Sequence, residues 1–254
     1  MEIGGFTQSF DVAQLVLYVF WAFFAGLIYY LQREAHREGY PMDPGRVNGP
    51  VTTGWPLVQP KTYKMRHGPD MVAPNPDRPD GGFSFEPGNN PWSGGNIVPK
   101  GDPLLAGVGP GAWAMRADEP DLTYEGAPKI VPLRVAKDYN VAKQNIDPRG
   151  LQVIGADKES AGQVCDMWVD QSESIFRYIE VALKGSEARV LIPMNFARIN
   201  KEGVHVNALM SYQFGNVPKT RVPEQITLLE EEKIMGYFGA GLLYAHPSRQ
   251  EPLL

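Results

Sequence analysis

The sequence predicts a single membrane-spanning helix near the N-terminus, followed by a mainly-β domain that carries a helix towards its C-terminus. Three observations support this fold class. An uncharged apolar stretch covers Val12–Leu31, short apolar runs separated by turn residues recur between Leu151 and Leu209, and a helix-capping pattern begins at Thr227.

The first of these elements is the apolar stretch Val12–Leu31, which has twenty residues and no charge. At a rise of about 1.5 Å per residue, such a helix spans about 30 Å, the thickness of a bilayer's hydrocarbon core. A cleaved signal peptide would need a basic start, a shorter apolar core and small residues at its end, whereas this stretch ends in Tyr29, Tyr30 and Leu31. We therefore expect a retained anchor.

The charges that flank this stretch predict its orientation. No Lys or Arg precedes it, whereas Arg33, His36 and Arg37 follow it directly. Basic residues concentrate on the cytoplasmic side of membrane helices, so we expect the N-terminus outside and the long C-terminal part in the cytoplasm.

The middle of the chain is rich in residues that oppose regular structure. Of the 23 prolines, 17 lie between Pro41 and Pro132, together with 14 of the 27 glycines. Composition alone is typical of disorder. We favour an irregular chain laid over a partner's surface, because the region also carries large aromatic residues: Trp55, Phe83, Phe85, Trp92 and Trp113.

The distribution of apolar residues along the chain changes from about Leu151 onwards. Apolar runs of five to twelve residues recur with turn signals between them, at 151–155, 163–170, 174–183, 188–199 and 204–209. Such spacing predicts an antiparallel barrel or sandwich. A helix is then expected from Thr227, because Thr227 and Glu230 form a capping-box pattern, with Ile234, Phe238 and Leu242 along one side.

Composition narrows the possible functions. The formal net charge is −5, which argues against nucleic acid as the main partner. The single cysteine, Cys165, excludes an internal disulfide framework, and the four histidines show no metal-ligand spacing. No nucleophile elbow or phosphate-binding loop is present, so the sequence predicts neither an enzyme nor a metal site.

Several long segments resemble one known family in the right order. They are FWAFFAGLIYYLQRE and REGYP around the anchor, GDPLLAGVGPGAW at 101–113, and KIVPLRVA, DMWVDQSE, HVNAL and TLLEEEKIMGY further on. Over nearly its full length the chain resembles the H subunit of the purple-bacterial photosynthetic reaction centre.

This resemblance implies a PRC-type antiparallel β-barrel that caps the cytoplasmic face of the L and M subunits, shields the quinone sites and assists proton transfer to the secondary quinone. It implies that this non-catalytic chain binds no cofactor alone, while the other subunits hold bacteriochlorophyll, bacteriopheophytin, quinones and non-haem iron. Membrane lipids and the light-harvesting antenna are further expected contacts. The alternative is a membrane-tethered PRC-barrel module for binding or assembly.

The resemblance also implies a location and a domain plan. The chain is expected in the bacterial inner, intracytoplasmic photosynthetic membrane. Residues 1–11 would be periplasmic, 12–35 would form the membrane helix and its exit, 36–105 would extend over the partner surface, and 106–254 would form the cytoplasmic barrel domain with its C-terminal helix.

Acidic residues before and after Gln171 are the first candidates for proton transfer. Asp166, Asp170 and Glu173 lie close together in sequence, with Arg177 four residues beyond Glu173. Taken alone, such a cluster is more often a solvated turn. The resemblance places Asp170 and Glu173 on positions that the family uses in its proton path, with Arg177 as a basic neighbour.

The surface end of that path departs from the family. Some members carry an Asp and a closely spaced pair of His there, but residues 121–128 of this chain contain no His. A histidine titrates near neutral pH and suits proton collection. Asp121 and Glu125 would collect protons less selectively.

Lipid contacts are expected where the anchor leaves the membrane. Arg33, Arg37 and Tyr40 lie where anionic head groups would be, and His36 is expected to contact head groups too. The alternative is that these residues are an ordinary stop-transfer signal, which ends insertion of the chain into the membrane and binds no specific lipid.

Overall fold

The computed structural model describes residues 5–7, 10–40, 42, 54–75, 84–88 and 96–250. The chain divides into two compact units, Met1–Arg78 and Pro79–Leu254, and each is described by itself. Phe83 and Trp92, two aromatic residues of the middle segment, lie outside the described residues.

The first unit is built around helix α1, Val12–Ala35. Strands β1, Gly5–Thr7, and β2, Phe10–Asp11, pair ahead of it. The Asp11 carboxylate caps the helix by accepting the Ala13 amide at 3.1 Å, as expected where the first amides lack partners. With a mean hydropathy of 1.9, α1 is long and apolar enough to cross a membrane, and none of its side chains is buried within the structure. The predicted helix is confirmed and runs four residues further.

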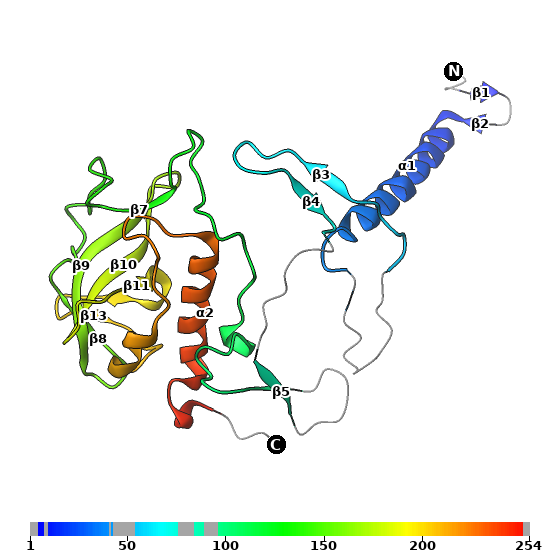
Figure 1. Cartoon of the computed structure of the whole chain (residues 1–254). Coiled ribbons are helices and arrows are strands. Elements are labelled where there is room, and N and C mark those ends of the chain that lie inside the picture. Colours follow the sequence, from blue (N-terminus) through cyan, green and yellow to red (C-terminus); the bar gives the residue numbers. More distant parts are fainter. Residues whose placement is uncertain are drawn as a thin grey trace. The chain divides into compact units, whose positions relative to one another are not determined.

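A short antiparallel hairpin follows, formed by β3, Lys61–Tyr63, and β4, Met71–Ala73 (Figure 1). Glu34 joins it to the end of α1, because its carboxylate lies 2.8 Å from Arg37 and 3.6 Å from Lys61. His36 was expected at the head groups. It is instead buried, with Nδ1 2.6 Å from the Gln32 carbonyl and its ring 4.2 Å from that of Tyr40.

The second unit contains a seven-stranded sheet, and most of its strands fall in the apolar runs seen in the sequence (Figure 1). The strands are β7 (Ile130–Pro132), β8 (Gln152–Ile154), β9 (Ser160–Asp170), β10 (Ile175–Leu183), β11 (Arg189–Pro193), β12 (Arg198–Ile199) and β13 (Val204–His205). Their order is β11-β10-β9-β8-β13-β12, with β7 also on β9. Among the described strands, only β8 and β13 pair in parallel.

Both faces of the long strands are covered. Tyr178, Ile179, Glu180 and Val181 are consecutive and all buried, so side chains on both faces of β10 are covered there. Register shifts between β9 and β10 interrupt the simple period of two. Neighbouring residues of both strands, such as Trp168 and Val169 or Tyr178 and Ile179, belong to one apolar core.

Smaller elements complete this unit. Hairpin strands β5, Phe85–Pro87, and β6, Ile97–Pro99, lie in the proline-rich segment. Four short 3₁₀ turns follow: η1 (Gly109–Gly111), η2 (Met194–Phe196), η3 (Ser211–Asn216) and η4 (Pro247–Arg249).

Helix α2, Leu228–Tyr244, starts at the predicted capping box. Thr227 Oγ1 accepts the Glu230 amide at 3.1 Å, and the Glu230 carboxylate accepts the Thr227 amide at 2.9 Å. Ile234, Phe238 and Leu242 lie along one side of α2, as expected; the first two are fully buried and Leu242 is 55% exposed. The last turns pack instead through Ala240 and Gly241 on another side of the helix.

Segment 109–113 lies directly against α2. A Cβ atom at Gly239 would clash with the Pro110 carbonyl, and one at Gly236 would lie 2.8 Å from the Gly111 carbonyl. The glycines of α2 weaken an isolated helix, but here they let the loop backbone reach the helix surface.

Candidate proton-transfer site

The turn between β9 and β10 positions the first acids of the site. Asp170 ends β9 with its side chain fully buried. Its Oδ1 accepts the backbone amides of Ser172 and Glu173, both at 3.0 Å, which fixes the turn. Glu173 stands on this turn with its side chain 49% exposed, and Arg177 follows on β10.

Lys129 gathers three carboxylates around one ammonium group. Its Nζ lies 3.4 Å from Asp121 Oδ2, 3.5 Å from Asp170 Oδ2 and 3.7 Å from Glu173 Oε1. Arg177 closes the group from the other side, with Nη2 2.9 Å from Glu173 Oε2 and 3.4 Å from Asp170 Oδ2. We call Asp121, Lys129, Asp170, Glu173 and Arg177 the Lys129 cluster.

Backbone pairing explains why this cluster forms. Strand β7 places Ile130 opposite Asp170, so the preceding Lys129 reaches the end of β9. The Lys129 amide also donates to the Asp121 carbonyl at 2.8 Å, which brings Asp121 to the same edge. Lys129 is far from Asp170 in sequence, so no local pattern predicts their contact. The segment KIVPLRVA, which begins at Lys129, resembles the family but did not identify Lys129 as a site residue.

The cluster's charges oppose and stabilise one another. Burial disfavours the charged form of Lys129, but Asp170, Asp121 and Glu173 outweigh burial and raise the pKa of Lys129. With all groups ionised, three acids face two cations. The carboxylates range from buried Asp170 to half-exposed Glu173, so the cluster leads from solvent into the protein.

A second acid site lies near Arg177 and was also missed. Tyr178 donates its hydroxyl to Glu231 Oε2 on α2 at 2.8 Å. Burial raises the pKa of Glu231, against the opposing effects of the Tyr178 hydrogen bond and of Arg116 and Arg177. Burial and the Glu231 charge likewise raise the pKa of Tyr178. A cavity of about 460 Å³ is lined by Arg116, Arg177, Tyr178, Glu231 and Glu232, among others.

Asp166 belongs to a separate network. Its Oδ2 lies 3.0 Å from Arg134 Nη1, which also contacts Glu180. Glu180 is buried and additionally accepts Trp168 Nε1 at 2.9 Å and Arg189 Nη1 at 3.0 Å. Burial would raise the pKa of Glu180, but these donors together hold it below its ordinary value. The structure therefore places Asp166 with Arg134 and Glu180 in a network of its own.

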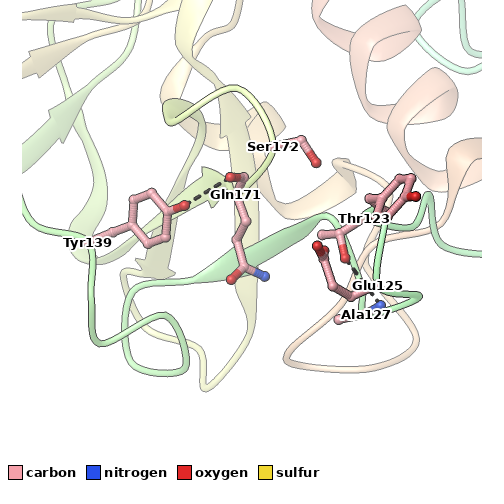
Figure 2. Close-up of a pocket in the computed structure, with 7 residues that line it drawn as sticks. Thr123, Glu125, Ala127, Tyr139, Gln171 and Ser172 are labelled. Atoms are coloured by element: carbon pink, nitrogen blue, oxygen red, sulfur yellow. Dashed lines mark hydrogen bonds between the residues drawn. The ribbon is translucent and has the colours of Figure 1, made fainter.

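Glu125 lies in the hairpin-like loop 121–128, which also carries Asp121 and is closed by the bridge between Leu122 and Pro128. It lines a cavity of about 580 Å³ with Thr123, Ala127, Tyr139, Gln171 and Ser172, among others (Figure 2). Tyr139 donates its hydroxyl to the Gln171 carbonyl at 2.8 Å across this cavity. Since Gln171 and Ser172 belong to the turn that follows Asp170, the cavity adjoins the Lys129 cluster.

The residues expected at lipid head groups have different environments. The Arg33 side chain is 42% exposed, whereas that of Arg37 is 10% exposed and forms two bonds to Glu34. Tyr40 packs on the His36 ring. Arg33 therefore pairs with Glu34, 3.4 Å from its Nη2, and still presents part of its side chain to solvent or lipid, while Arg37 and Tyr40 fasten the chain after the helix.

Cys165 has the environment of a structural thiol. Burial, followed by the Glu180 charge, raises its pKa to about 11, and its Sγ lies 3.4 Å from the Glu180 carbonyl. Across the part of the chain that the structure describes, no three His, Cys, Asp or Glu side chains are grouped to hold a metal ion.

Two protein-family models match the chain. Residues 4–135, more than half of the sequence, match the model described as photosynthetic reaction centre, H-chain N-terminal region. Residues 145–211 match the PRC-barrel domain and cover β8 to β13. The chain therefore belongs to the photosynthetic reaction-centre H-chain family, a non-catalytic subunit of the reaction centre with a PRC-barrel domain.

Proposed function

We propose that this chain caps the cytoplasmic face of the L and M subunits, shields their quinone sites and helps deliver protons to the secondary quinone. The observation that carries the proton-transfer role is the Lys129 cluster, in which three carboxylates surround one ammonium group between solvent and the interior.

The cluster has the properties that a proton relay needs. Each carboxylate lies about 3 to 4 Å from Lys129 or Arg177, which gathers the acids into one region where water can bridge them. Lys129 and Arg177 reduce the cost of holding the carboxylates side by side. Glu173 and Asp170 contact the same ammonium and guanidinium groups, so the half-exposed acid and the buried acid are neighbours in one chain of contacts.

Glu231 extends this proposal to a second position. Its pKa is raised towards neutral pH and Arg177 borders both sites, so Glu231 serves as an inner proton store. Asp121 and Glu125 serve as collectors at the hairpin, and Asp166 supports the neighbouring strand.

The location follows from the anchor. Helix α1 spans the bacterial inner, intracytoplasmic photosynthetic membrane once, with residues 1–11 in the periplasm and the barrel in the cytoplasm. Arg33 and Arg37 support this orientation. Bacteriochlorophyll, bacteriopheophytin, the quinones and the non-haem iron are held by L and M, with lipids and the light-harvesting antenna as further neighbours.

Two experiments test these roles separately. Purification from the native membrane in mild detergent should bring down two further polypeptides and near-infrared pigment absorbance, and a colourless chain purified alone contradicts the assembly role. In the assembled complex, Glu173→Gln should slow the second electron and proton transfer to the secondary quinone and leave primary charge separation unchanged. Glu187→Gln is the matched control, because Glu187 is an exposed acid at the turn after β10. Equal turnover in both variants removes Glu173 from the path.

A further inference from the structure

The segment that follows α1 returns to the helix and exposes apolar side chains beside it. The Trp55 ring lies with its centroid 6.3 Å from that of Tyr29, on the last turns of α1. Pro56 is buried, but Trp55 is 76% exposed and Leu57 is 74% exposed. We call residues 54–57 the Trp55 loop.

Contacts on both sides hold this loop against α1. Gly54 has φ +74° and packs on the His36 ring, where a Cβ atom would lie 2.5 Å from Cδ2. Arg37 Nη1 donates to the Gln59 carbonyl at 2.5 Å, and Lys61 pairs with Glu34. Trp55 and Leu57 are therefore exposed although the loop that carries them is held in place on both sides.

The position of the loop along α1 matches the edge of a bilayer. Tyr29 precedes Arg33 by four residues, which places Tyr29 about 6 Å deeper along the helix axis. Trp and Tyr side chains concentrate at this depth, where an apolar ring meets polar head groups. A loop that contacts Tyr29 thus reaches the interface rather than open water.

The charges beside the loop indicate what covers it. Arg33, Arg37 and Lys61 surround a single acid, Glu34, and the side chains of Arg33 and Lys61 remain 42% and 48% exposed. An excess of cations next to exposed apolar groups fits anionic lipid. We propose that the Trp55 loop is a second membrane contact, in which Trp55 and Leu57 enter the lipid interface while Arg33 and Lys61 face anionic head groups. This inference rests on the proposed membrane anchoring of α1.

Fluorescence quenching by lipid tests the proposal in the assembled complex. The single cysteine permits a Cys165→Ser background, in which Leu57→Cys carries an environment-sensitive fluorophore in vesicles that contain phosphatidylglycerol. Position 57 is exposed, so the substitution leaves the packing intact. The Cys165→Ser complex without Leu57→Cys is treated with the same fluorophore, and its signal corrects for labelling of other chains. We expect a blue shift, quenching by lipids brominated near the head group, and protection from aqueous iodide.

Two control positions separate this inference from the anchoring itself. Val19→Cys, within α1, should be quenched by lipids brominated deep in the acyl chain, and Glu187→Cys should be quenched by iodide alone. If Val19→Cys is not quenched by lipid, the anchor and the loop contact both fail. If it is quenched while Leu57→Cys responds only to iodide, the loop lies in water. If Leu57→Cys is shielded from both quenchers, a partner subunit covers it, and the lipid proposal is overturned.

A charge variant tests the head-group part. Brominated phosphatidylglycerol should quench the probe at position 57 more than brominated phosphatidylcholine at the same fraction, and Lys61→Gln should abolish that difference. An unchanged difference in Lys61→Gln contradicts a role for Lys61 in lipid recognition. Lys143→Gln, at an exposed lysine of the other unit, is the control and should leave the difference unchanged.

Discussion

Lys129 Nζ lies 3.5 Å from the fully buried carboxylate of Asp170, although strand β7 and the end of β9 are far apart in sequence. Antiparallel pairing of these strands creates this contact, and the same ammonium group then reaches Asp121 and Glu173. The fold thus assembles a cluster of three acids and two cations from side chains that no local motif joins.

Replacing Lys129 should weaken both the fold and the relay. In Lys129→Met, Asp170 keeps Arg177 as its remaining side-chain cation, and we expect a loss of about 1–3 kcal/mol in the free energy of unfolding. The folded pKa of Lys129 is raised above 10.5, so its contribution is fully present below that value and lost only as the pH rises through the folded pKa. Denaturant unfolding at neutral pH therefore reports the whole loss.

The same variant should change proton transfer. With three acids and one cation, the cluster binds protons more tightly, so the pH at which proton uptake by the complex falls should move upward. Lys143→Met, an exposed lysine elsewhere in the same unit, should change neither stability nor uptake. If the two variants behave identically, the charge of Lys129 affects neither the stability of the chain nor proton uptake by the complex.

Glu231 should give a stability signature of the same sign as Lys129, but at lower pH. Burial raises its folded pKa above 4.5, so the folded chain holds more protons there than the unfolded chain, and stability falls as the pH rises from about that value through the folded pKa. Glu231→Gln keeps an acceptor for the Tyr178 hydroxyl and cannot ionise. Its stability relative to the unsubstituted chain should therefore increase with pH across this window.

Denaturant unfolding as a function of pH measures this difference. Glu202→Gln, on an exposed turn, is the control and should follow the unsubstituted chain. A constant gap between Glu231→Gln and the unsubstituted chain would mean that burial does not perturb Glu231. In the assembled complex, Glu231→Gln should also slow proton uptake after the second flash if Glu231 stores a proton.

Local patterns predicted the elements of this fold well. The charge-free stretch predicted α1, the capping box predicted the start of α2, and apolar runs bounded by turn residues predicted β8 to β11. Strand β7 was missed as a strand because three residues, one of them a proline, give no periodic signal. The parallel pairing of β8 with β13 was missed because strand order depends on contacts distant in sequence.

The candidate site was predictable only in part. The Glu173–Arg177 ion pair follows from four-residue spacing, although the pair joins a turn to a strand instead of lying on a helix. Asp166 could not be separated from Asp170 by spacing, because its partner Arg134 comes from the chain after β7. Lys129 and Glu231 were missed for the same reason, since strand pairing and helix docking decide which distant charges meet.

Gly239 should be intolerant of a side chain despite its place in a helix. Gly→Ala gains about 1 kcal/mol in an isolated helix, but at Gly239 the new methyl group would clash with the Pro110 carbonyl. We expect Gly239→Ala to lower the free energy of unfolding by about 1–3 kcal/mol, as overpacked sites do. Gly215→Ala, where nothing lies within 4 Å of the added Cβ, is the control in the same unfolding assay.

Arg33 and Arg37 should respond differently to the same substitution. Arg33 is exposed, so Arg33→Gln should reduce the amount of anionic lipid that is retained by the purified complex and leave its subunits associated. Arg37 is nearly enclosed by Glu34 and the Gln59 carbonyl, so Arg37→Gln should loosen the chain after the helix and make segment 54–61 more susceptible to proteolysis. Mass spectrometry of bound lipid and limited proteolysis measure the two effects, and primary charge separation should be unchanged in both variants. Equal lipid retention in Arg33→Gln and the unsubstituted complex would identify Arg33 as ordinary flanking charge.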